Sequence, residues 1–152
     1  MPPEYRARIE AFRPQLHQIA RERYGVELNQ GPFGMDSRPA HIAAQVAAAH
    51  GRGAEFHDRA LRAYWQEARA LDDPDTLLAI AQEAGLERDS FMAGLRNPLF
   101  ERQVDEDIAQ AAAYGLSGVP ALIFAGKYLV SGAQPVDVLR RVVDKVREET
   151  AA

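Results

Sequence analysis

Few side chains in this 152-residue sequence could carry chemistry. Cysteine is absent, which excludes disulfides, thiolate metal sites and a cysteine nucleophile within these residues. His41, His50 and His57 could share a helix face only if one helix continued through two intervening glycines, so we expect no metal site. Ser117 has no histidine close by in the sequence that could activate it. We therefore expect no catalytic side chain and no bound metal.

A proline opens a strongly apolar stretch near the C-terminal end, SGVPALIFAGKYLVSGAQP. Proline has no N–H to give to a sheet ladder, so Pro120 suits the first position of a strand and not its interior. A cis peptide bond is realistically available only before proline, where it serves tight turns. The spacing predicts two strands, 120–124 and 127–131, around the hairpin residues Ala125 and Gly126.

The elements before this hairpin are expected to be helices. The first spans 5–24, with Pro14 bending or splitting it, and a short extended piece is expected over 26–28. Ser37 is the expected N-cap of a helix that runs to about residue 50, and a second helix spans about 54–70. Asp73-Pro74 and Asn97-Pro98 each predict a helix start, a short helix lies between them, and a last helix follows Pro135.

Composition indicates an ordinary globular chain. Hydrophobic residues make up 47% and charged residues 26%, and the formal net charge is −4. Acidic and basic residues are interleaved, which argues against nucleic acid as the main partner. No apolar run reaches transmembrane length, and the first residues do not have the pattern of a signal peptide. We expect a cytoplasmic protein.

The stretches SRPAHIAAQVAAAHG, AEFHDRALRAYWQEARALDDPDTLLAIAQEAGL and GLSGVPALIFAGKYLVSGAQP, taken in order, carry a resemblance. Together they resemble DsbA-like proteins of the FrnE type, which are polyketide-biosynthesis dithiol-disulfide isomerases related to 2-hydroxychromene-2-carboxylate isomerases. The resemblance implies an α/β, thioredoxin-like (DsbA-like) fold, truncated at the N-terminus. Such a fold would be mostly helical, with an inserted helical domain and a closing β-β-α. The expected parts are an N-terminal helix and loop over 1–36, the helical domain over 37–116 and the β-β-α over 117–150.

The resemblance also implies a binding surface. In that family the residue before a cis-proline presents its main chain to a substrate peptide or to glutathione, which would make Gly118, Val119 and Pro120 the substrate-binding residues. Phe56, Tyr64 and Trp65 most simply fill the helical core, but in the family this domain overhangs the active site. Tyr64 and Trp65 could therefore also line a cleft.

The family's Cys-x-x-Cys turn has no counterpart here, so no thiol-disulfide exchange is expected from this polypeptide alone. One hypothesis is an oxidoreductase-family protein that contributes the substrate- or glutathione-facing half. The alternative is a non-catalytic binding or dimerisation module. No cofactor is expected, and glutathione is a candidate ligand. The edge of the 120–124 strand should be covered, either by a second copy in a homodimer or by a separate Cys-x-x-Cys β-α-β chain.

Overall fold

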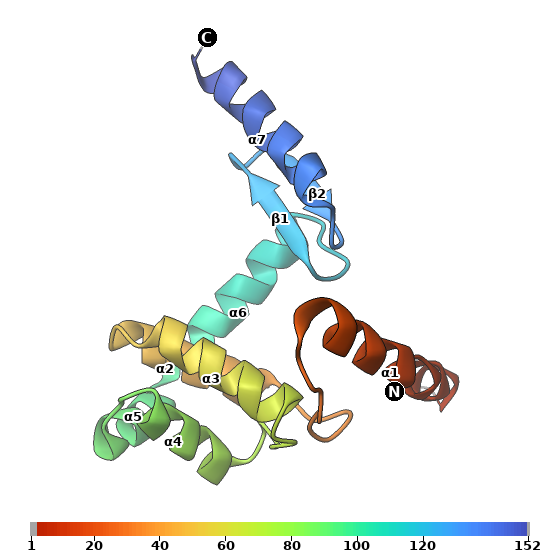
Figure 1. Ribbon diagram of the computed structural model, residues 1–152. Coiled ribbons are helices and arrows are strands. Elements are labelled where there is room, and N and C mark those ends of the chain that lie inside the picture. The colour runs from red at the N-terminus through yellow and green to blue at the C-terminus, as the bar shows by residue number, and fades with distance from the viewer. Residues whose placement is uncertain (1–2, 152) are drawn as a thin grey trace. The chain divides into compact units, whose positions relative to one another are not determined.

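The computed structural model describes residues 3–151, which are mostly helical with one small sheet (Figure 1). The chain divides into two compact units, Met1–Asp105 and Glu106–Ala152, and the division falls within α6. In chain order the elements are α1 (Pro3–Tyr24), α2 (Arg38–Ala49), α3 (Gly53–Trp65), α4 (Pro74–Glu83), α5 (Arg88–Leu95), α6 (Pro98–Ala113), β1 (Ala121–Phe124), β2 (Tyr128–Ser131) and α7 (Val136–Ala151).

The core of the first unit is built from four short helices, α2 to α5. Small residues on α2, Ala43 and Ala47, are fully buried and allow the neighbouring helices to approach closely. Larger side chains from the facing helices complete the core, with Phe56 and Phe91 in ring contact at a centroid distance of 6.3 Å. Hydrophobic burial of this kind is the main source of stability for the unit.

Local signals set the starts of two helices, α4 and α6. The Asp73 carboxylate accepts a 3.0 Å hydrogen bond from the Thr76 N–H, and Pro74 occupies the first turn, so this predicted start of α4 is confirmed. Asn97 likewise accepts from the Leu99 N–H at 3.0 Å before α6 begins at Pro98. The predicted cap at Ser37 is wrong in its chemistry, because its side chain makes no capping bond. Asp36 instead accepts from the Arg38 N–H at 2.9 Å.

The helix α1 is not split at Pro14, and the segment 26–28 pairs with no strand among the described residues. One predicted helix end in the first unit is wrong. The helix α3 ends at Trp65 and not near 70, because Ala68 adopts a left-handed backbone conformation with φ of 57°. The Arg69 N–H then bonds back to the Ala63 carbonyl at 2.9 Å, which closes the turn.

The second unit contains the predicted hairpin. β1 and β2 pair antiparallel, with Ala121 opposite Ser131 and Phe124 opposite Tyr128. Ala125 and Gly126 both have positive φ values, 52° and 65°, which is the backbone of a type I′ turn.

None of the described helices in either unit is long and apolar enough to cross a membrane.

We expect Asp73→Ala to lower the midpoint of thermal unfolding by a few degrees. The Asp73 side chain accepts hydrogen bonds from both the N–H and the hydroxyl of Thr76, and these bonds lower the pKa of the carboxyl group. A carboxyl whose pKa is lowered by folding stabilises the protein above its unfolded pKa, and that contribution is lost as the pH falls through the folded pKa. The effect should therefore be present at pH 7 and vanish in acid, as thermal unfolding followed by circular dichroism at both pH values would measure.

Asp75→Ala is the matched control, since Asp75 lies in the same first turn but is not the capping residue. An equal loss of stability in the two variants would show that general charge at the helix start, and not the cap, stabilises α4.

Candidate functional site

The candidate site is the loop over residues 117–120, which leads into β1. The Val119–Pro120 peptide bond is cis, and the Pro120 carbonyl accepts a 2.8 Å hydrogen bond from the Gly132 N–H on the β2 side. Successive residues of a strand direct their N–H and C=O groups to opposite edges. Because Pro120 faces β2, the main-chain groups of Ala121 face the other edge.

Val119 is unusually open for an apolar residue. It is 94% exposed, and its N–H and C=O make no hydrogen bond to any residue from 3 to 151. Gly118 is also exposed, and no atom lies within 4 Å of the place a side chain would occupy. The loop therefore offers one free donor and one free acceptor that an extended peptide could pair with in an antiparallel ladder.

Contacts with α7 hold the hairpin in place beside this loop. The Lys127 ammonium lies 2.8 Å from the Glu149 carboxylate, and the Tyr128 hydroxyl also donates to Glu149. The hydrogen bond from Lys127 lowers the pKa of Glu149, and the same bond raises the pKa of Lys127, so both groups stay charged near neutral pH. Lys145 lies over the Tyr128 ring at 5.0 Å, which places α7 on the sheet face that carries Tyr128.

Tyr64 and Trp65 lie at the C-terminal end of α3, in the first unit. Their rings are in edge contact at 5.0 Å, and Tyr64 packs against the buried core. Their carbonyls accept hydrogen bonds from the loop that follows α1, with Gly31 N–H bonded to Tyr64 and Asn29 N–H bonded to Trp65. This arrangement agrees with the interpretation of Tyr64 as a packing residue. The predicted role of Tyr64 and Trp65 in a cleft stays a prediction.

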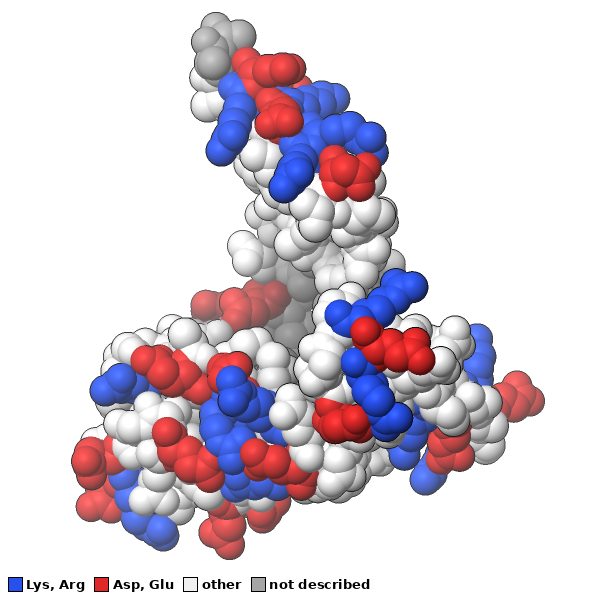
Figure 2. Space-filling view, viewed as in Figure 1, with Lys and Arg blue, Asp and Glu red and all other residues white. Residues whose placement is uncertain are grey.

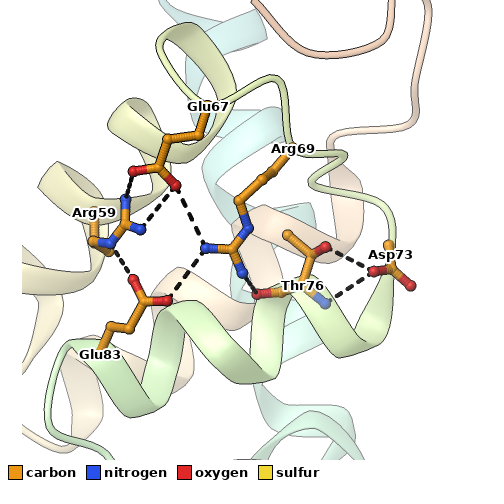
Figure 3. A network of polar contacts seen from close by, with 6 residues as sticks. All are labelled: Arg59, Glu67, Arg69, Asp73, Thr76 and Glu83. Atoms are coloured by element: carbon orange, nitrogen blue, oxygen red, sulfur yellow. Dashed lines mark hydrogen bonds and ion pairs between the residues drawn. The ribbon is translucent and has the colours of Figure 1, made fainter.

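A network of ion pairs in the first unit was not predicted from the sequence (Figure 3). Arg59 makes a two-pronged contact with Glu67 at 2.7 and 2.8 Å and also donates to Glu83. Arg69 approaches the same two carboxylates and donates to the Thr76 carbonyl at 3.4 Å. Hydrogen bonds from Arg59 lower the pKa of Glu67. The bond between Arg59 on α3 and Glu83 on α4 ties these two helices together. The two positive and two negative charges balance, so the network has no net charge with which to bind a ligand.

The first unit also has a cavity of about 270 Å³, which sequence reasoning missed. Apolar groups from three helices form most of its wall, and the charged Arg38 at its rim is already paired with Glu101 at 3.3 Å and Asp105 at 2.7 Å. Four separate segments build this cavity, so no motif in the sequence could have located it. Its lining residues are Asp36, Arg38, Pro39, Ile42, Pro74, Leu77, Leu95 and Glu101.

The histidines do not form a cluster in the part of the chain that is described. One ring nitrogen of His50 lies 2.9 Å from the carbonyl of Val46 on α2, and His50 directly follows the end of this helix. Among residues 3–151, no group of three or more histidine, aspartate or glutamate side chains is arranged so that it could hold a metal ion.

Known structures share the arrangement of the elements. A probable DsbA oxidoreductase from Streptomyces coelicolor superposes with a TM-score of 0.80 at 25% identity, over 94% of this chain and 62% of its own length. A candidate protein disulfide isomerase from Nitrosomonas europaea superposes with a TM-score of 0.79 at 20% identity, over 98% of this chain and 76% of its own length. The cytosolic disulfide reductase DsbM from Pseudomonas aeruginosa superposes with a TM-score of 0.58 at 26% identity, over 77% of this chain and 61% of its own length. This chain thus spans less than two thirds of the length of the Streptomyces protein.

These similarities define a DsbA-like thioredoxin fold, mostly helical with a small two-stranded sheet, as the sequence predicted. A model of the DSBA-like thioredoxin domain matches residues 2–144. The chain belongs to the DSBA-like thioredoxin domain family. A search of curated proteins found no match.

Proposed function

We propose that this chain is a FrnE-type member of the thiol-disulfide oxidoreductase family that binds a peptide or glutathione through the main chain of Val119. The observation that carries the proposal is the N–H and C=O of this exposed residue, which bond to no residue that the structure describes. Gly118 and Pro120 flank it, and the open space around Gly118 allows a ligand to approach the backbone closely. We place the protein in the cytoplasm, a placement supported by its similarity to a cytosolic disulfide reductase.

Redox chemistry needs a thiolate, and these 152 residues have no cysteine. The part assigned to these residues is therefore recognition: the main chain of Val119 aligns an extended ligand, and the thiols that react lie outside these 152 residues. This division supports the alternative function as well, namely a binding or dimerisation module with no part in catalysis. The absence of cysteine is the observation that favours the alternative.

The test is binding of reduced glutathione and of a short cysteine-containing peptide, measured by isothermal titration calorimetry. We expect Val119→Pro to weaken binding about tenfold, because it removes one main-chain donor and a hydrogen bond contributes roughly 0.5–1.5 kcal/mol. Val119→Ala is the matched control, since it shortens the side chain but keeps the N–H, and it should bind nearly as the wild type does.

Binding by the wild type that is unchanged in Val119→Pro would place the ligand elsewhere. Absence of binding by the wild type to either ligand would remove the recognition hypothesis and leave the binding or dimerisation module. An insulin-reduction assay does not separate the two functions, because both predict no activity for this chain alone.

A further inference from the structure

The cavity of the first unit is a small pocket with a mostly apolar wall. Ile42 of α2, Leu77 of α4 and Leu95 of α5 contribute to this wall, and Leu77 is part of the buried core. The volume of about 270 Å³ lies just below the range of about 300–1,000 Å³ that is usual for ligand pockets. Since a cavity of about 150 Å³ already holds benzene, this pocket has room for one ring or one short hydrocarbon chain.

The positive charge at the rim of the cavity is already neutralised. The Arg38 guanidinium lies 2.7 Å from a carboxylate oxygen of Asp105 and 3.3 Å from one of Glu101. Hydrogen bonds to these two carboxylates raise the pKa of Arg38. The second carboxylate oxygens of Glu101 and Asp105, and one oxygen of Asp36, bond to no residue that the structure describes. Three carboxylates therefore stand against one cation at this part of the rim.

The side of the cavity formed by α4 is acidic as well. Pro74 lines the cavity, and Asp73 and Asp75 are its two neighbours in the chain. Hydrogen bonds from Thr76 lower the pKa of Asp73, so this carboxyl is charged at neutral pH. Over most of the first unit, by contrast, acidic and basic side chains are mixed, as the face shown in Figure 2 illustrates. The rim of the cavity thus has a local excess of negative charge.

Three helices begin beside the cavity, and helix N-termini generally favour anions. At each of these starts, however, a side-chain oxygen of the chain itself already accepts a hydrogen bond from a main-chain N–H: Asp36 at α2, Asp73 at α4 and Asn97 at α6. The N-terminal ends are therefore capped from within, and two of the three caps are carboxylates. An anionic ligand would meet these carboxylates and a guanidinium that is already paired.

We propose that the cavity binds a small organic cation, with its hydrocarbon part against Ile42, Leu77 and Leu95 and its ammonium group at the rim beside Glu101 and Asp36. The apolar wall removes the hydrocarbon from water, which is the main driving force for binding. The rim oxygens that have no partner among the described residues accept hydrogen bonds from the ammonium group. A primary alkylamine in its protonated form is the simplest ligand of this class.

This site shares no residue with the loop over 117–120, and its lining residues all belong to the first unit. The two proposals can therefore fail separately. Val119→Pro should leave binding of the amine unchanged, and absence of amine binding would leave the recognition proposed for Val119 untouched.

The first experiment compares three ligands that have the same six-carbon chain and different charge: hexylammonium, hexan-1-ol and hexanoate. Each is titrated into the whole chain at low ionic strength, because salt screens exposed charges. Binding is followed by NMR through the methyl signals of Ile42, Leu77 and Leu95. We expect hexylammonium to shift these signals and to saturate with a Kd of roughly 1 mM, as suits so small a ligand. Hexan-1-ol should bind several times more weakly, and hexanoate more weakly still. The methyl signals of Leu129, in the second unit, should not move.

A pair of charge variants tests the rim. Glu101→Gln keeps the size of the side chain and removes one negative charge, and it should weaken hexylammonium binding about threefold, the scale of an exposed ion pair. Glu55→Gln is the matched control, because it makes the same change on α3, which contributes no residue to the cavity wall. It should bind hexylammonium as the wild type does. Both glutamates are exposed, so neither change disturbs the core.

Three results would overturn the proposal. The first is the absence of saturable shifts at Ile42, Leu77 and Leu95 with hexylammonium up to about twenty times the expected Kd. The second is binding of hexanoate or hexan-1-ol as tight as that of hexylammonium, which would show that the acidic rim does not select a cation. The third is an equal effect of Glu101→Gln and Glu55→Gln, which would mean that the amine responds only to the overall charge of the chain.

Discussion

Phe91→Ala is expected to reduce the free energy of unfolding of the first unit by about 3–5 kcal/mol. The Phe91 ring is fully buried where α5 packs against α2 and α4, and it contacts the ring of Phe56. The substitution removes the transfer free energy of a large side chain and leaves a cavity that the surrounding helices fill only in part. The helix α5 has eight residues and is too short to be stable without this packing.

Urea unfolding, followed by the helical circular dichroism signal, would measure this loss. Phe12→Ala is the matched control, because Phe12 is 50% exposed on α1 and should lose less than about 1 kcal/mol. A loss for Phe91→Ala that is no larger than that of Phe12→Ala would mean that the ring does not anchor the helices as the structure indicates.

The features that sequence predicted correctly are those whose cause is local. Asp73-Pro74 and Asn97-Pro98 begin helices because the capping oxygen and the proline lie within a few residues of the bonds they affect. The hairpin follows from the turn formed by Ala125 and Gly126, whose positive φ values fit the twist of the strands.

The features that sequence missed depend on residues far apart in the chain. The end of α3 was predicted about five residues too late. The segment after Trp65 turns at Ala68, and Glu67 in it binds Arg59, eight residues earlier. Arg59 in turn binds Glu83, 24 residues later. No local pattern carries such pairings.

The start of α2 was missed for a different reason. Asp36 and Ser37 are adjacent and each has a side-chain oxygen that could accept a hydrogen bond there, and the sequence could not show that Asp36 makes the bond.

The candidate site likewise combines features that the sequence predicted with features that only the structure shows. A motif and a family resemblance located residues 118–120 in the sequence. The exposure of Val119 and the absence of hydrogen bonds to its main chain among the described residues, however, depend on the folded loop and cannot be read from the motif. The hydrogen bond from the Gln134 side-chain amide to the Ser131 carbonyl likewise joins two groups that composition does not indicate as partners.

Gly94→Ala should destabilise the first unit by about 1–3 kcal/mol, although alanine is the better helix former by about 1 kcal/mol. Gly94 lies within α5 and faces α2, and a Cβ added there would stand 2.5 Å from one methyl carbon of Val46 and 3.0 Å from the other. Val46 is fully buried, and its branched side chain has little rotameric freedom in a helix. The clash can be relieved only if α2 and α5 move apart.

A double-mutant cycle with Val46→Ala tests this mechanism by the same urea unfolding measurement. Val46→Ala alone should cost about 2 kcal/mol, because it removes two buried methyl groups. In the double variant the new methyl group occupies part of the space that the valine leaves, so the combined loss should be about 1 kcal/mol smaller than the two single losses added together. Gly118→Ala, where nothing lies within 4 Å, should change stability little. If Gly94→Ala stabilised the protein, helix propensity would outweigh contact, and α5 would not pack as closely on α2 as the structure has it.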